Sequence, residues 1–157
     1  MRYEELQNQH FIKGLDPVAD AFSGTVASDV VDVSNHQGAL FLVYKGVGTT
    51  GTSTITVEAC DDVTPTNTTA VAFYYKAITS NDTQGAVTAA TSAGFTTTAG
   101  SSQIYAVQVD AQELASAGYK YVRLKAVEVV DSPVLGGIAI ALIGPKFGGS
   151  ATNSAID

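Results

Sequence analysis

The sequence predicts an all-β protein: a β-sandwich or jelly-roll-like domain of about eight strands, with one short helix and an extended N-terminal arm. The first observation is strict alternation over residues 52–60, where Ile55, Val57 and Ala59 alternate with polar residues. A period of two gives a pleated strand one apolar face and fits a helix badly. The second is the apolar run at 39–45. The third is the recurrence of such short segments between turns of Gly, Asp, Asn and Pro.

The expected strands begin at residue 22. They cover residues 22–27, 30–34, 39–45, 53–60, 70–78, 103–109, 121–130 and 135–143. The third and fourth are expected to pair as a β-hairpin, because the segment between them is rich in Gly and Thr. The apolar positions of the strongest strands give the candidate core residues, which are Leu42, Ile55, Val57, Val122, Leu124, Val127, Ile138 and Ile140.

Two connections are long enough to hold structure of their own. Residues 80–100 are rich in Thr, Ala and Gly, and a short strand at 86–90 or at 95–98 is an open alternative to an irregular loop. Residues 110–118 predict a helix of one or two turns, because Asp110 can cap its start, Glu113 follows three residues later and Gly118 can end it.

The chain divides into an arm at residues 1–20, a sandwich domain at 21–147 and a flexible tail at 148–157. The arm lacks strand periodicity, and a helical turn is expected at 3–9. Phe11, Ile12 and Leu15 lie outside every expected strand, yet they are apolar enough to need a partner surface. We therefore expect these three residues to contact another chain.

Composition bounds the function classes. The 157 residues carry a formal net charge of −7, and the few Lys and Arg are scattered, which argues against a nucleic-acid partner. No apolar run reaches the roughly 18 residues of a membrane helix, and the acidic start does not resemble a signal peptide, so we expect a soluble protein made in the cytosol. Cys60 is the one cysteine, and we expect it to be a small buried apolar residue.

No residue pattern points to a metal or a cofactor. The two histidines, His10 and His36, have no neighbours at metal-ligand spacing and are expected to be exposed. Asp61 and Asp62 lie in an oxygen-rich loop that could in principle hold calcium. The alternative, that they hydrogen-bond the backbone, is favoured because the EF-hand spacing is missing.

Catalysis and sugar binding are the remaining alternatives. Glu58 and Glu128 lie on polar strand faces and no serine occupies a nucleophile elbow, so we expect no enzyme activity. Tyrosines could form the floor of a sugar groove, but strand alternation places part of each adjacent pair in the core. They are Tyr74, Tyr75, Tyr105, Tyr119 and Tyr121.

The segments TGTSTITVEACDD and YVRLKAVEVVDSPVLGG, within a likeness that spans residues 20–147, resemble small structural proteins of tailed bacteriophages found among head-assembly products. The resemblance implies a head decoration, or cement, protein with a β-sandwich body. Such a protein is made in the host cytoplasm and binds the major capsid protein on the head exterior of the virion. Self-association, commonly as a trimer, is implied as well. The alternatives are a tail or neck component and a carbohydrate-binding module for host attachment.

Overall fold

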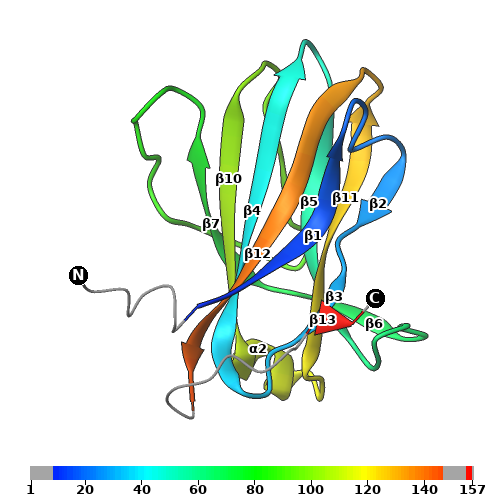
Figure 1. Ribbon diagram of the computed structural model, residues 1–157, viewed down its shortest axis with the longest axis vertical. Helices are drawn as coiled ribbons and strands as arrows, with labels where there is room; N and C mark the ends of the chain where they lie inside the picture. Colours follow the sequence, from blue (N-terminus) through cyan, green and yellow to red (C-terminus); the bar gives the residue numbers. More distant parts are fainter. Residues whose placement is uncertain (1–8, 147–154, 157) are drawn as a thin grey trace.

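Two antiparallel sheets pack face to face in the computed structural model, which describes residues 9–146 and 155–156 (Figure 1). The fold is therefore an all-β sandwich, as the alternating segments predict. One sheet has six strands in the order β1 (His10–Val18), β12 (Val134–Pro145), β4 (His36–Gly48), β10 (Gln103–Asp110), β7 (Phe73–Ile78) and β8 (Thr88–Ala90).

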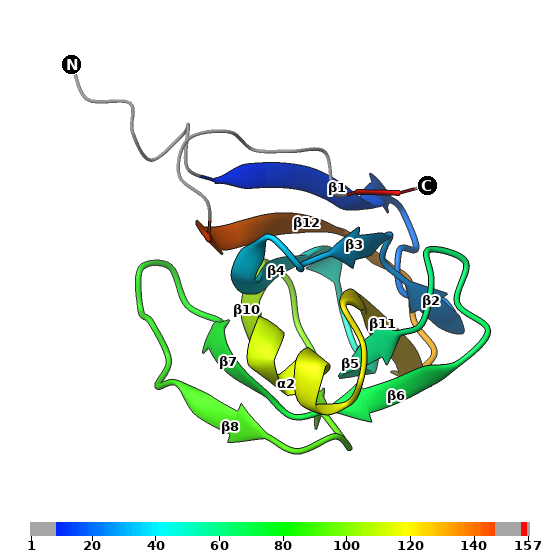
Figure 2. The same ribbon diagram turned by 90° about the horizontal axis from the view of Figure 1, so that it is seen from below.

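The second sheet has seven strands. Its main order is β13 (Ala155–Ile156), β3 (Val30–Asp32), β11 (Tyr121–Val130), β5 (Thr52–Cys60) and β6 (Thr68–Val71), while β2 (Thr25–Ala27) pairs with β11 and β9 (Phe95–Thr96) pairs with β5. Viewed from below, the two layers enclose the core, and α2 (Ala111–Ser116) lies across their lower end (Figure 2). Leu114 of α2 is fully buried.

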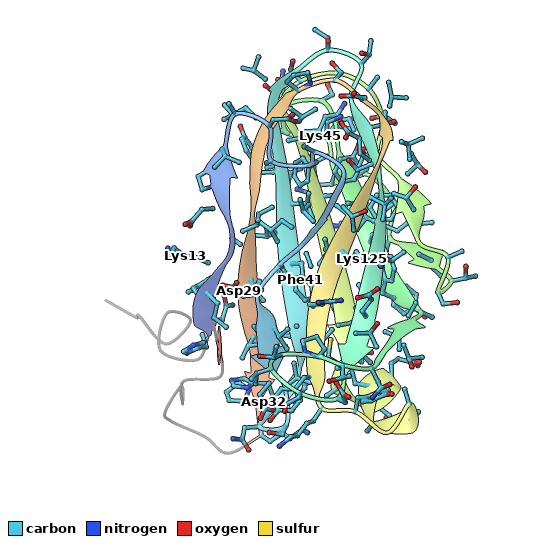
Figure 3. All side chains as sticks on the ribbon, turned by 90° about the vertical axis from the view of Figure 1, so that its right-hand side faces the viewer. Lys13, Asp29, Asp32, Phe41, Lys45 and Lys125 are labelled. Carbon is cyan, nitrogen blue, oxygen red and sulfur yellow. The ribbon has the colours of Figure 1, made fainter. Side chains whose placement is uncertain are left out.

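The core lies between the inner faces of the two sheets, where Phe41 is placed (Figure 3). Six of the eight predicted core residues are buried; Leu42 and Val127 are not, and each is 37% exposed. The prediction was wrong for these two because the strands alternate with the opposite phase there. In β4 the buried residues are Phe41 and Val43, and in β11 they include Leu124 and Ala126.

The predicted β-hairpin at residues 39–60 is wrong. β4 pairs with β10 and β12, whereas β5 pairs with β11, β6 and β9, so the connection crosses from one sheet to the other (Figure 1). Apolar side chains of both strands face the shared core from opposite layers, and burial of both inner faces drives the two strands apart into different sheets.

A similar crossing divides the expected strand at residues 70–78. The chain leaves the seven-stranded sheet after Val71 and enters the other sheet at Phe73. The long segment at 80–100 is not an irregular loop throughout, because it contains two short strands, β8 and β9. β9 pairs with Thr54 and Ile55 of β5. Gly94 precedes β9 with φ +76°, and a Cβ there would overlap the Ile55 carbonyl oxygen, so only glycine fits this close approach.

The arm expected at residues 1–20 contains a strand that sequence reasoning missed. β1 pairs antiparallel with β12, so residues 10–18 belong to the six-stranded sheet rather than lying outside it. Gly14 and Pro17 disguise the strand, and its register shifts between Lys13 and Leu15 and again before Val18. An edge strand tolerates such irregularities because it has one ladder partner.

The helix at residues 110–118 is confirmed. Asp110 is the N-cap residue with extended backbone, although its side chain makes no capping hydrogen bond, and Gly118 follows the helix with φ +84°. Most of the helical turn expected at 3–9 lies outside the described residues, which begin at residue 9. Most of the tail expected at 148–157 lies outside them as well. Within that tail, β13 pairs with Val30 and Val31 of β3.

Candidate interaction face

The outer surface of the six-stranded sheet is apolar across several strands. Strand register places outward residues of neighbouring strands side by side. One row runs from Ala139 on β12 to Leu42 on β4 and Ala106 on β10. We call this surface the apolar face; its residues are Phe11, Leu40, Leu42, Tyr44, Tyr74, Ile78, Ile104, Ala106, Leu135, Gly137, Ala139 and Ala141.

A trough runs along β12 within the apolar face. Gly137 and Ala139, the small outward residues of β12, form its floor, while β1 borders one side and β4 the other. Its volume is about 680 Å³. On the β4 side, Leu42 and Tyr44 stand beside the floor and are 37% and 52% exposed. The register therefore sets a ridge of large side chains next to a trough of small ones.

Charge is confined to the margins of this surface. In the row through Leu42, Lys13 on β1 and Lys76 on β7 stand at the two ends, and the positions between them are Ala139, Leu42 and Ala106. The Lys13 ammonium lies 3.2 Å from the Asp16 carboxylate, and both side chains are exposed. Figure 3 shows Lys13 beside β1, away from the core. The centre of the face is thus uncharged in a chain with a net charge of −7.

The outer surface of the seven-stranded sheet is more polar, although Val127 and Val129 are exposed on β11. Glu58 on β5 lies opposite Arg123 on β11, and its carboxylate is 2.7 Å from the Arg123 guanidinium and 2.9 Å from the Lys125 ammonium. Burial alone would raise the pKa of Glu58, but the hydrogen bonds from Lys125 and Arg123 outweigh burial and hold that pKa below its usual range. The single carboxylate bridges two cations on the neighbouring strand, so the cluster ties β5 to β11.

The three residues predicted to bind a partner, Phe11, Ile12 and Leu15, all line the trough. Phe11 is 59% exposed. Ile12 and Leu15 are half-buried and pack against the core as well. The structure therefore brings the three together at one edge of the apolar face. Sequence reasoning missed the larger part of the face, on β4, β10 and β12, because register between distant strands decides which apolar residues share a surface.

The histidines and the acidic loop are explained by local structure. His36 is buried, not exposed as expected, and its Nδ1 has no hydrogen-bond partner among residues 9–146 and 155–156. In the acidic loop, the Asp61 carboxylate accepts hydrogen bonds from the backbone of Thr66 and Asn67 and from the Asn67 amide, and Asp62 accepts one from Val63. These bonds confirm the backbone interpretation of the loop. Within the described residues, no group of three His, Cys, Asp or Glu side chains could hold a metal.

The tyrosines do not converge on one groove. Tyr105 is buried and donates a hydrogen bond to Gln103, Tyr75 stacks on Phe95, and Tyr74 is exposed on the apolar face. Tyr119 packs against the core, and Tyr121 lies beneath the Lys120 ammonium. Their side chains serve different parts of the fold.

Two buried reactive groups have structural roles. Lys45, near the upper end of the sandwich in Figure 3, donates hydrogen bonds to the Gly51 carbonyl at 2.8 Å and the Thr98 carbonyl at 2.5 Å. Burial lowers the pKa of Lys45. Cys60 is buried at the end of β5, as predicted, and burial raises its pKa to about 11. Both groups are enclosed by the protein.

Comparisons with known proteins add little. No family model matches the chain, and no curated protein is significantly similar to it. A solved structure described as the SPBc2 prophage-derived protein YomS is similar at a TM-score of 0.42 and 14% sequence identity, covering 84% of this chain and 92% of that chain. A likeness this weak carries no functional argument. No helix in residues 9–146 or 155–156 is long and apolar enough to cross a membrane.

Proposed function

We propose that this protein is a non-enzymatic structural component of a bacteriophage particle, a decoration protein that binds the major capsid protein on the outside of the head and stabilises the shell. The sequence resemblance suggests the class. The observation that carries the proposal is the apolar face, a broad uncharged surface on one side of a sandwich whose other side is more polar.

An exposed apolar surface of this extent needs a protein contact. Soluble monomers rarely expose continuous apolar patches beyond a few hundred Å², and larger patches mark interaction sites. Phe11, Tyr44 and Leu135 are exposed together with Leu42 around the trough. A subunit that is permanently held in an assembly can carry such a surface, because the surface is covered in the assembled particle.

The mechanism is adhesion by many modest contacts. A decoration protein that touches several capsid subunits, and is repeated over the shell, adds resistance to internal pressure without a strong single contact. Only 15% of the residues are charged, so most contacts with the shell should involve apolar and neutral groups, which raised salt does not screen. Adhesion of this kind is therefore expected to persist in concentrated salt.

The direct test uses heads that lack this protein. Purified protein is added to empty expanded heads, and co-sedimentation is measured at salt concentrations from about 0.1 to 1 M. We expect saturable binding that changes by less than about threefold over this range, and decorated heads that rupture at higher temperature than bare heads. Bovine serum albumin, an acidic protein without the face, serves as the non-binding control.

Three results would count against the proposal. Heads that bind no protein at any salt, with the protein instead found in tails or necks by immunogold labelling of virions, would favour the tail or neck alternative. Protein that binds heads yet leaves their rupture temperature unchanged would remove the stabilising role. Binding abolished by host polysaccharide would favour host attachment.

A further inference from the structure

We infer that the apolar face is the contact between two copies of this chain, packed sheet to sheet across a two-fold axis that runs parallel to the strands between β4 and β12. The inference deepens the proposed function, on which it rests, by naming what covers the face. The pair would then present its remaining surfaces to the shell from both copies at once.

The register makes the face complementary to itself. Leu42 on β4 lies beside Ala139 on β12, and Tyr44 lies beside Gly137. A two-fold axis between these strands sets β4 of one copy over β12 of the other and keeps each row opposite itself. Leu42 then lies over Ala139 of the second copy, and Tyr44 lies over Gly137 of the second copy. Each ridge therefore enters the trough of the other copy.

The area is sufficient for a specific pair. Strands lie about 4.8 Å apart and alternate residues about 6.8 Å apart, so β1, β12, β4 and β10 with four outward positions each span roughly 19 by 27 Å. This is about 500 Å² per copy in projection. Two copies bury about 1,000 Å², which reaches the lower limit for a specific interface.

The position of the charges fits this arrangement. With the axis between β4 and β12, Lys13 on β1 faces Ala106 on β10 of the second copy, and Lys76 on β7 falls beyond the edge strand β1 of that copy. Neither lysine meets the other, and both can keep their ammonium groups in water. The uncharged centre matches homodimer interfaces, which are more apolar than transient ones. Pairing also covers the apolar face before the protein binds a shell, which lowers the risk of aggregation.

The experiment is sedimentation equilibrium of the purified full chain and of matched variants. We expect a mass of twice 16.2 kDa for the wild type at micromolar concentration. Leu42→Lys places a charge at the centre and should weaken the pair at least tenfold. Val129→Lys is the control, because Val129 is 57% exposed on β11 of the other sheet, and should leave the pair unchanged.

A swap of the two facing residues tests the geometry. Ala139→Leu fills the trough and Leu42→Ala removes the ridge, so each alone should weaken the pair at least tenfold. The double variant L42A/A139L exchanges ridge and trough across the axis and should recover most of the loss. Circular dichroism of each variant verifies that the sandwich is folded.

The outcomes separate this inference from the proposed function. A wild type that remains monomeric at about 100 μM, one that forms a trimer, or a double variant as weak as the sum of its singles overturns the two-fold pair. If the Leu42→Lys variant is monomeric and still binds heads, the decoration role does not require the pair. A stable pair that binds no heads leaves the interface standing without the decoration role.

Discussion

Phe95 stacks face to face on Tyr75, with ring centroids 3.9 Å apart and ring planes 4° from parallel. Tyr75 belongs to β7 of the six-stranded sheet, and Phe95 belongs to β9, which pairs with β5 of the other sheet. The stack therefore joins the two sheets along one side of the sandwich. The Phe95 ring also approaches Tyr105, at 5.5 Å between centroids. This contact fixes the long segment at 80–100 against the core.

Phe95→Ala should release that segment and cost about 2 to 4 kcal/mol in the free energy of unfolding, because the ring fills space between the sheets. Denaturant unfolding measures the cost, and hydrogen exchange should show faster opening of β8 and β9. Val87→Ala is the matched control in the same segment. Val87 is 64% exposed, and its truncation should change stability by less than about 0.5 kcal/mol. Equal costs for the two variants would contradict the anchoring role of the ring.

Leu124→Ala should destabilise the protein by about 2 to 5 kcal/mol, because Leu124 is fully buried between the sheets. Val127→Ala, three residues along the same strand, should cost less than about 1 kcal/mol, since Val127 faces outward. Chemical denaturation of both variants tests the phase of β11. A reversed order of costs would mean that the strand is buried with the opposite alternation.

Glu58→Gln should cost about 1 to 3 kcal/mol, because Arg123 and Lys125 lose the carboxylate with which both form ion pairs. The pKa of Glu58 is lowered in the folded protein, so its contribution is present above the unfolded pKa of about 4.3 and is lost as the pH falls through the folded value. Thermal unfolding from pH 7 to pH 3 should therefore show a smaller acid loss in the variant. Glu113→Gln, at an exposed position of α2, should retain the full wild-type loss.

His36 should make the fold sensitive to mild acid. Burial of the ring lowers its pKa, the positive charges of His10 and Lys146 lower it further, and the Asp32 carboxylate opposes them. The unfolded chain then takes up the proton first, so stability is full above about pH 6.5 and falls as the pH drops below that value. Melting temperatures between pH 7 and pH 5.5 measure the loss. It should vanish in His36→Leu and persist in His10→Gln, since burial of His36 is the main cause.

The Cys60 thiol should be inert in the native protein. Its pKa is raised to about 11 by burial, and the side chain has no exposed surface. A maleimide reagent at pH 8 should label unfolded but not folded protein. Because the folded pKa lies above the unfolded value of about 8.5, this group stabilises the fold below that value and the stability is lost as the pH rises toward 11. Rapid labelling of folded protein would show that β5 opens at this end.

Local patterns in the sequence were sufficient for the helix and for most of the strands, but not for β1, which Gly14 and Pro17 disguise, nor for the pairing of the strands. The alternation of Ile55 and Val57 identifies β5 and its buried face correctly. Alternation cannot specify which strands lie next to β5, because it shows only which side of the strand is buried. β5 pairs with β11, far along the chain, and with β6, which follows it directly. The hairpin prediction failed for this reason, since a Gly- and Thr-rich connection also permits a crossing between sheets.

The candidate site was predicted only at its edge. Phe11, Ile12 and Leu15 were predicted to contact another chain because they are apolar and lie outside every expected strand. All three line the trough. Leu42 was assigned to the core because an apolar residue in an apolar run gives no sign of which side it faces. β4 carries large apolar residues on both sides, and its outer side is the one that the proposed pairing would cover. The outward residues of β4 follow only once Phe41 is known to be buried, because residues 40, 42 and 44 must then face the other side of the strand.

The crossings between sheets also bear on how quickly the chain can fold. Among the strands that the structure describes, only two successive pairs, β5 with β6 and β7 with β8, are ladder partners. β1 pairs with β12 near the other end of the chain. Native contacts are therefore mostly distant in sequence. The loop-closure entropy of forming them opposes folding before burial of apolar surface can stabilise them. Sandwiches of this kind fold in milliseconds to seconds, and β1 can join the sheet only after β12 has been made and placed.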